Sequence, residues 1–335
     1  PNLSEFTMTT THMQTEILGT EPSVLSLPTQ IPSDIQATLD AGAPWLFVGS
    51  GSSFHLGSAL AATLTDLGLD AQAIPSAEIV FHKAGLAAYG RQVVAISRSG
   101  TTTETVEAVR KVVTLARGVH AITTVEGSPL AAAATASTVM PAAHERSVVQ
   151  TRSVVAAGWL VASWFKTPAL HAASLWSGHT DASLAWAAKL PTDVRRVHLL
   201  GDGRFWPVAR EGALKLKESA LLDAEAFETF EHRHGPRSLV DESTLVIGML
   251  QSDSSEPALE VLRELEGFGA KVATLATEGV APFGVSLRWA LGWSLPFDVT
   301  APMTALQAYA LHAAQARGLN PDAPRHLAYS VLLDD

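Results

Sequence analysis

The sequence has no cysteine, few charged residues and no long apolar run. The absence of cysteine excludes disulfides, cysteine-based zinc sites and a thiol nucleophile. No apolar run reaches the ~20 residues that a transmembrane helix needs, so we expect no membrane partner. The stretch 1–18 lacks the basic and apolar regions of a secretory signal. Together these features favour a cytoplasmic location.

Positive charge is also scarce, because 23 Lys and Arg face 33 Asp and Glu and the formal net charge is −10. This balance argues against nucleic acid as a partner. It does not argue against a phosphorylated substrate, because a few local donors can bind phosphate on an acidic protein. The hydrophobic content of 47% and charged content of 17% indicate a folded globular protein of 335 residues with one to three domains.

Two strand–glycine turn–helix units predict an α/β fold. In the first, the apolar run WLFV is followed by Gly49-Ser-Gly-Ser-Ser53 and a helix. The second begins at Val197 with the similar segment HLLGDGRF. Their offset (198 − 46 = 152) indicates an internal repeat. We therefore expect two tandem domains, each a mostly parallel sheet flanked by helices in three α/β/α layers.

The other apolar and periodic stretches complete this outline. Strands are expected at 71–75, 93–96, 120–124, 139–141, 245–250, 272–275 and 293–295. Helices are expected at 11–27, 144–164, 256–268 and 305–316. The predicted parts are an N-terminal tail and lead-in helix (1–28), a first domain (29–168), a second domain (190–320) and a C-terminal tail (321–335).

The best candidate phosphate site is SRSGTTTE at 97–104, which directly follows the strand at 93–96. Hydroxyl side chains and a glycine lie there at a helix N-terminus, where free N–H groups and the helix dipole favour an anion. Thr101 and Glu104 also fit a capping box, which would be a purely local role. Both interpretations are open, and they are compatible.

A second candidate site lies on the helix that we expect to begin at Pro207. Glu211, Lys215 and Glu218 recur at intervals of four and three residues, and a loop ending in His234-Gly-Pro follows. Two carboxylates, an ammonium group and a histidine are enough for general acid–base chemistry. The alternative is a surface helix with solvated ion pairs.

The segment EGALKLKE at 211–218, followed by His-Gly-Pro at 234–236, resembles the sugar isomerase (SIS) family. That family includes the isomerase half of glucosamine-6-phosphate synthase and stand-alone deaminases and phosphosugar isomerases. The resemblance covers roughly residues 12–331 and implies two tandem SIS domains. It implies that Glu218 moves the proton between C1 and C2, that Lys215 lies beside the reacting carbon, and that His234 assists ring opening. It also implies a homodimer in which His234 crosses the interface.

The same resemblance implies where a sugar phosphate would bind, and it implies no metal or other cofactor. Glu145 and Gln150 fall near the implied sugar pocket. The implied substrate and phosphate positions are Ser52, Ser53, Ser97, Arg98, Ser99, Thr102, Val148, Ala328 and Tyr329. Arg98 stands where the synthase has glutamine, and its guanidinium could add charge to the phosphate site or pair with a carboxylate. Tyr329 stands where the synthase has its imine-forming lysine, and a phenol cannot form a Schiff base. It can donate a hydrogen bond to a sugar oxygen or fill space.

The implied function is a phosphosugar isomerase or deaminase that acts on an amino-hexose 6-phosphate by C1–C2 enolisation, in a glucosamine-6-phosphate/fructose-6-phosphate type interconversion. We expect no glutaminase domain, which depends on an N-terminal cysteine. One alternative is a deglycase that cleaves a sugar-phosphate–amino acid conjugate by the same enolisation. Another is a non-catalytic sugar-phosphate sensor. The complete catalytic motif, with no helix-turn-helix domain before Trp45, favours the enzyme.

Overall fold

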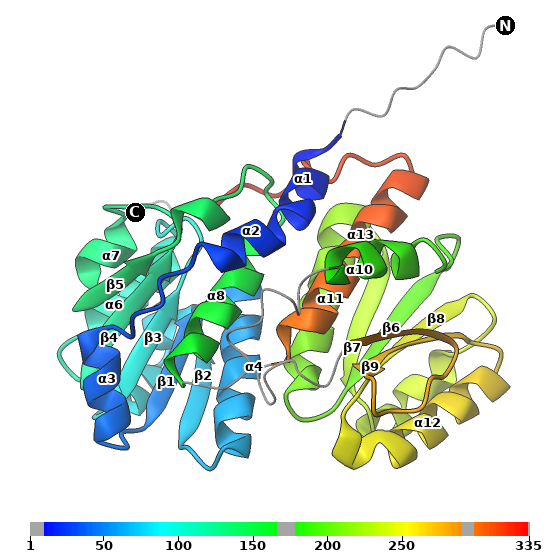
Figure 1. Cartoon of the computed structure of the whole chain (residues 1–335), viewed down its shortest axis with the longest axis horizontal. Helices are drawn as coiled ribbons and strands as arrows, with labels where there is room; N and C mark the ends of the chain where they lie inside the picture. Colours follow the sequence, from blue (N-terminus) through cyan, green and yellow to red (C-terminus); the bar gives the residue numbers. More distant parts are fainter. Residues whose placement is uncertain (1–9, 166–177, 290–297, 334–335) are drawn as a thin grey trace, which may run out of the picture.

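The protein is built on two five-stranded sheets (Figure 1). Its structure is a computed structural model that describes residues 10–165, 178–289 and 298–333. Every strand pair described in either sheet is parallel. Helices cover both sheets, so the predicted α/β class with two tandem domains is confirmed. The exact domain boundaries stay a prediction.

The first sheet has the strand order β2-β1-β3-β4-β5. Its strands are β1 (Trp45–Gly49), β2 (Ala71–Pro75), β3 (Gln92–Ile96), β4 (Gly118–Thr123) and β5 (Ala136–Val139). The accompanying helices are α3 (Ser33–Asp40), α4 (Ser52–Asp66), α5 (Ser76–Phe81), α6 (Thr103–Val112), α7 (Pro129–Ala133) and α8 (Arg152–Trp164), with 3-10 turns η1 (Lys83–Ala88) and η2 (Pro141–Ala143). Strands β1 and β3 are buried along their whole length, as expected for a parallel sheet covered on both faces.

The second sheet repeats this design with the order β10-β9-β8-β6-β7. Its strands are β6 (Arg196–Gly201), β7 (Asp223–Glu228), β8 (Thr244–Leu250), β9 (Lys271–Thr277) and β10 (Val285–Trp289). The helices are α10 (His179–Ala187), α11 (Phe205–Ala220), α12 (Ser255–Gly267) and α13 (Thr300–Ala316), with turns η4 (Glu231–Arg233), η5 (Pro236–Leu239) and η6 (Ser252–Ser254). Helices α1 (His12–Leu18) and α2 (Thr20–Leu25) precede the first sheet.

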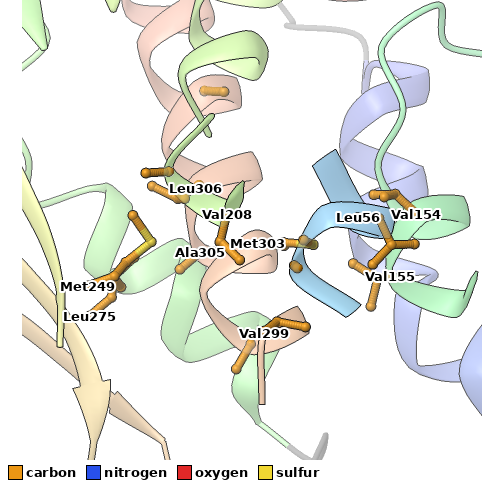
Figure 2. Packing of buried hydrophobic residues seen from close by; sticks show 14 of the residues in the cluster. Leu56, Val154, Val155, Val208, Met249, Leu275, Val299, Met303, Ala305 and Leu306 are labelled. Atoms are coloured by element: carbon orange, nitrogen blue, oxygen red, sulfur yellow. The ribbon is translucent and has the colours of Figure 1, made fainter. Parts of the chain in front are cut away.

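One apolar cluster runs from the first sheet to the second through four helices (Figure 2). Leu56 of α4 and Val154 of α8 belong to it on one side, and Val208 of α11 and Met303 of α13 on the other. Helix α13 is buried on nearly all sides, which suits its almost wholly apolar sequence. Because interiors pack densely and resist deformation, this core holds α11 firmly against α4.

Three expectations about individual elements are wrong. The helix expected from residue 144 begins only at Arg152, because the Glu145 carboxylate accepts hydrogen bonds from Thr151 and from the Ser153 N–H and so caps the helix start. The lead-in helix breaks at Gly19 into α1 and α2. Helix α11 starts at Phe205, two residues before Pro207.

Strands β7 and β10 were not predicted. Both are edge strands of the second sheet. They contain exposed polar residues and therefore lack the continuous apolar run that identifies a buried parallel strand in the sequence. The strand expected at 293–295 lies outside the described residues. In the described part of the chain, no helix has the length and apolar character needed to cross a membrane.

Candidate active site

A small polar cavity opens where the first sheet reverses its strand order, between β1 and β3. Ligands of open α/β sheets bind in this crevice, beyond the carboxyl ends of the strands. Its lining residues are Ser50, Ser53, Ile96, Ser97, Arg98, Ser99, Thr102, Thr105, Gln150 and Tyr329. Six predicted binding residues are among them: Ser53, Ser97, Arg98, Ser99, Thr102 and Tyr329. The predicted residues Ser52, Val148 and Ala328 are not in this lining.

The loop from Ser97 to Thr102 is held in shape by its own hydroxyls and by one glycine. The Ser97 hydroxyl accepts from the Gly100 N–H at 3.2 Å, and the Ser99 hydroxyl accepts from the Thr101 N–H at 3.2 Å. Gly100 has φ +65°, and a Cβ there would lie 2.3 Å from the Ser128 hydroxyl oxygen, so only glycine fits. The capping-box interpretation is wrong, because the cap residue is Thr102 and its side chain makes no capping bond.

The guanidinium of Arg98 fastens three segments together at the edge of this cavity. Its terminal nitrogens donate to the carbonyl oxygens of Ser147 at 2.8 Å, Val148 at 2.9 Å and Tyr329 at 3.0 Å. One of them lies 3.5 Å from a Glu145 carboxylate oxygen. Among the described residues, Arg98 Nε has no hydrogen-bond partner. Arg98 therefore anchors neighbouring backbone, and its predicted contact with phosphate stays a prediction.

The C-terminal tail packs against the loop of the first domain that contains Arg98. The Tyr329 ring lies 4.0 Å from the guanidinium carbon of Arg98, and its hydroxyl donates to the Glu145 carbonyl oxygen at 2.9 Å. Burial raises the pKa of Tyr329, which keeps the phenol a neutral donor. Further along, the Val331 carbonyl accepts from the Thr103 N–H at 3.2 Å, at the start of α6. The tail thus covers one side of the polar cavity.

Two charged side chains of α11 are buried, and a third is partly buried. Glu211 and Lys215 are each 1% exposed, and Glu218 is 20% exposed. Lys215 Nζ donates to Glu218 Oε2 at 2.6 Å and lies 3.6 Å from Glu211 Oε1. The alternative of a solvated surface helix is therefore wrong for this face. One ammonium group lies between two carboxylates, and only Glu218 remains partly accessible.

The pKa shifts in this cluster follow from burial and from the pairing of charges. Burial alone would lower the pKa of Lys215, but the carboxylates of Glu218 and Glu211 outweigh burial and raise it. Burial alone would raise the pKa of Glu211, but Lys215 and the hydrogen bond from His55 lower it overall. The cluster therefore holds a protonated amine beside a carboxylate. A carboxylate can transfer a proton, and an ammonium group can stabilise the negative charge that develops on a nearby oxygen.

The cavity and the α11 cluster are neighbours, because α4 packs along α11. The Ser52 side chain, at the start of α4, is among the hydrogen-bond partners that lower the pKa of Glu211. The charge of Arg98 is close enough to oppose protonation of Lys215. The structure thus brings the hydroxyl-lined loops and the Lys215–Glu218 pair together from residues far apart in the sequence.

His234 lies apart from this cluster. It is exposed on the loop between η4 and η5, and its backbone N–H donates to the Glu231 carbonyl oxygen at 2.9 Å. Within the described residues of this one chain, no contact joins His234 to Glu218. The preceding His232 is fully buried, with its Nε2 2.9 Å from His198 Nδ1. Burial lowers the pKa of both buried histidines to about 4, so they serve as neutral anchors of the loop.

Sequence reasoning missed His55. It lies one helical turn after Ser52, and its Nδ1 is 3.2 Å from Glu211 Oε2. Its place within the first glycine turn and helix was the only available signal, because its partner is 156 positions away. Only the packing of α4 on α11 brings the two residues together.

These features define a two-domain α/β protein with a polar, hydroxyl-lined crevice at the strand ends of its first sheet and a buried lysine–glutamate cluster beside it. The profile of the SIS domain matches residues 45–165 and 192–282. The chain therefore belongs to the SIS domain family, and the resemblance found in the sequence is confirmed.

Proteins similar to this chain include enzymes named for their action on phosphosugars. The chain is 30% identical over 337 residues to glutamine–fructose-6-phosphate aminotransferase (isomerizing) of Pyrobaculum aerophilum, covering 92% of this chain and 54% of that protein. The corresponding Sulfolobus acidocaldarius protein is 29% identical, covering 86% and 50%. The chain thus spans about half the length of the curated relatives it matches.

Two solved structures share the fold. Glucosamine-6-phosphate deaminase from Thermotoga maritima has a TM-score of 0.81 and 26% identity, covering 96% of this chain and 100% of that chain. Tagatose-6-phosphate ketose/aldose isomerase from Escherichia coli has a TM-score of 0.74 and 22% identity, covering 97% and 96%. The chain's relatives are thus isomerase-type enzymes and isomerase domains.

Proposed function

We propose that this protein is a phosphosugar isomerase or deaminase that acts on an amino-hexose 6-phosphate by proton transfer between C1 and C2. The observation that carries the proposal is the pair of buried Lys215 and partly accessible Glu218, whose Nζ and Oε2 atoms lie 2.6 Å apart beside the hydroxyl-lined cavity. One site binds an anion, and the other moves a proton next to a carbonyl. Their closeness fits a substrate that carries a phosphate at one end and an enolisable carbon at the other.

In this proposal the phosphate enters the cavity, where Ser97, Ser99 and Thr102 donate hydrogen bonds to it at the start of α6. Glu218 takes the proton from one carbon and returns it to the neighbouring carbon. Lys215 stabilises the charge that develops on the sugar oxygen. With an amino sugar, the enamine becomes an imine, and water releases a ketose phosphate and ammonia. The relatives act on glucosamine-6-phosphate and fructose-6-phosphate by name, which supports this substrate class.

The decisive test is turnover of a small panel of phosphosugars. Glucosamine 6-phosphate, galactosamine 6-phosphate and a fructose-6-phosphate–amino acid conjugate are incubated separately with the protein, and released ammonia or amino acid is measured. We expect ammonia from one of the two amino sugars. Release of amino acid from the conjugate alone would establish the deglycase instead. Tight phosphosugar binding with no turnover of any compound would establish the sensor.

Replacing Ser99 with alanine is expected to weaken binding of fructose 6-phosphate by about 1–3 kcal/mol, because a hydrogen bond to a charged phosphate is lost. Isothermal titration calorimetry measures this change. Ser255 begins the corresponding helix α12 of the second sheet, so Ser255→Ala is the matched control and should bind normally. Unchanged affinity in Ser99→Ala would remove this serine from the phosphate site.

We also propose a homodimer in which each active site receives His234 from the partner. His234 is exposed and makes no contact with its own chain's Glu218 in the described residues. Glu218→Gln and His234→Asn variants are each expected to be inactive, but refolding them together should restore about a quarter of the sites, because half of the dimers are mixed and each carries one intact site. A mixture as inactive as its components, or a fully active monomer in sedimentation, would contradict the shared site.

A further inference from the structure

The position of Lys215 raises an electrostatic problem for the proposed reaction. Its side chain is 1% exposed, and its ammonium group donates a hydrogen bond to Glu218 at 2.6 Å. In the proposed enolisation, the C–H bond of the sugar breaks, its proton binds Glu218 and its electron pair moves to the sugar carbonyl oxygen. Lys215 then exchanges the charge of Glu218 for the charge that develops on this oxygen, until Glu218 delivers the proton to the adjacent carbon. Because a buried charge that loses a partner is costly, a second, permanent carboxylate would keep Lys215 paired and in place during this exchange.

Glu211 is placed to be that second carboxylate. Its Oε1 lies 3.6 Å from Lys215 Nζ and has no hydrogen-bond partner among the described residues. Its other oxygen, Oε2, lies 3.2 Å from His55 Nδ1. A carboxylate that binds a charge through one oxygen and a fixed donor through the other cannot rotate freely. The donor comes from α4, on the opposite side of the contact between the two domains.

We propose that His55 is a positioning residue of the active site: it holds Glu211 so that its free oxygen faces Lys215 throughout the proton transfer. This inference rests on the proposed function. An ionised carboxylate only accepts hydrogen bonds, so the His55 ring must donate through Nδ1. The lowered pKa of Glu211 agrees with an ionised carboxylate. His55 itself borders an open groove and is 13% exposed, so it supports Glu211 without sealing the site.

The kinetic test separates positioning from general stability. His55→Leu removes the donor, whereas His55→Asn keeps an N–H group at the place of Nδ1. We expect His55→Leu to lower kcat about 10- to 100-fold with KM nearly unchanged. A decrease of this size corresponds to the loss of one hydrogen bond to a charged group. His55→Asn should stay within a few-fold of the natural protein. If both variants fold and lose kcat equally, or if His55→Leu keeps its kcat, the proposal is overturned.

A matched control exists in the first domain. His120 is buried and, like His55, pairs through Nδ1 with a carboxylate, that of Asp34 at 2.9 Å, but it lies on β4 and outside the cavity lining. His120→Leu should lower the unfolding midpoint and leave kcat unchanged. An equal loss of kcat in His120→Leu would show that any lost histidine–carboxylate pair impairs the enzyme, and it would overturn the specific role of His55.

A crystal structure of His55→Leu tests the inference without any activity measurement. The Glu211 carboxylate is expected to turn away from Lys215 Nζ in the variant. A Glu211 that keeps its place and its 3.6 Å contact would overturn the positioning role. In contrast, a natural protein with no turnover of any phosphosugar, together with a displaced Glu211 in the variant, would overturn the proposed function and leave the positioning of Glu211 by His55 established.

Discussion

Glu218→Gln is expected to lower kcat by about 10²- to 10⁴-fold, the usual contribution of a general base. Glutamine keeps the size of the side chain, and its amide oxygen can still accept the 2.6 Å hydrogen bond from Lys215. It cannot take up a proton from carbon. Because the phosphate cavity is formed by other segments, binding of a phosphosugar should survive. Turnover and calorimetric binding, measured side by side, test both halves of this expectation.

Solvent deuterium provides a second measurement for Glu218. In the natural protein the proton passes through an exchangeable carboxyl group, so deuterium should enter the product at C1 or C2. Glu225 is an exposed carboxylate on β7, and Glu225→Gln is the matched control that should keep both turnover and exchange. Glu218 is not the base if Glu218→Gln keeps turnover within a few-fold, or if binding disappears together with activity.

The parts of this fold that could be predicted are those whose signal is local. Buried strands such as β1, β3 and β8 are continuous apolar runs, because both faces of a parallel sheet are covered. The edge strand β7 reads as DAEAFE and carries no such run. The start of α8 was placed too early, because Glu145 caps it from a loop that the sequence pattern does not separate from the helix.

The same distinction applies to the site. Lys215 and Glu218 are three residues apart on one helix, so their contact follows from helical spacing. The link between Glu211 and His55 spans 156 positions and depends on how two domains pack, which no local pattern reports. Arg98 shows a further limit: its place in a phosphate loop predicts contact with an anion or with a carboxylate, but its hydrogen bonds to the backbone carbonyls of Ser147 and Tyr329 could not be predicted, because only the tertiary fold brings those segments near.

Lys215→Met is expected to lose turnover and to lose more folding stability than the Ser99→Ala or Glu218→Gln variant. Methionine can fill much of the space of the lysine stem, but it leaves the fully buried carboxylate of Glu211 without its cation. Breaking a buried pair by removing one partner costs about 3–5 kcal/mol. The loss of charge stabilisation at the developing oxygen should lower kcat by about 10²- to 10³-fold, comparable to the loss of an oxyanion donor.

The pH dependence of this variant has a definite sign. In the natural protein the pKa of Glu211 is lowered below 4.5, so its stabilising contribution is present at neutral pH and is lost as pH falls. Without Lys215, burial dominates and raises that pKa, so the folded variant takes up a proton more readily than the unfolded chain. The stability deficit of Lys215→Met should therefore be largest at pH 7.5 and shrink toward pH 5. Urea unfolding at the two pH values measures it.

Lys217→Met is the matched control, because Lys217 is an exposed lysine on the same helix. Exposed substitutions of this kind usually change stability by about 0.5 kcal/mol or less. A Lys215→Met variant as stable as the control at pH 7.5 would show that Glu211 does not depend on this cation. A deficit that grows on acidification would show that the buried carboxylate is not the source of the instability, because protonation must relieve an unpaired negative charge.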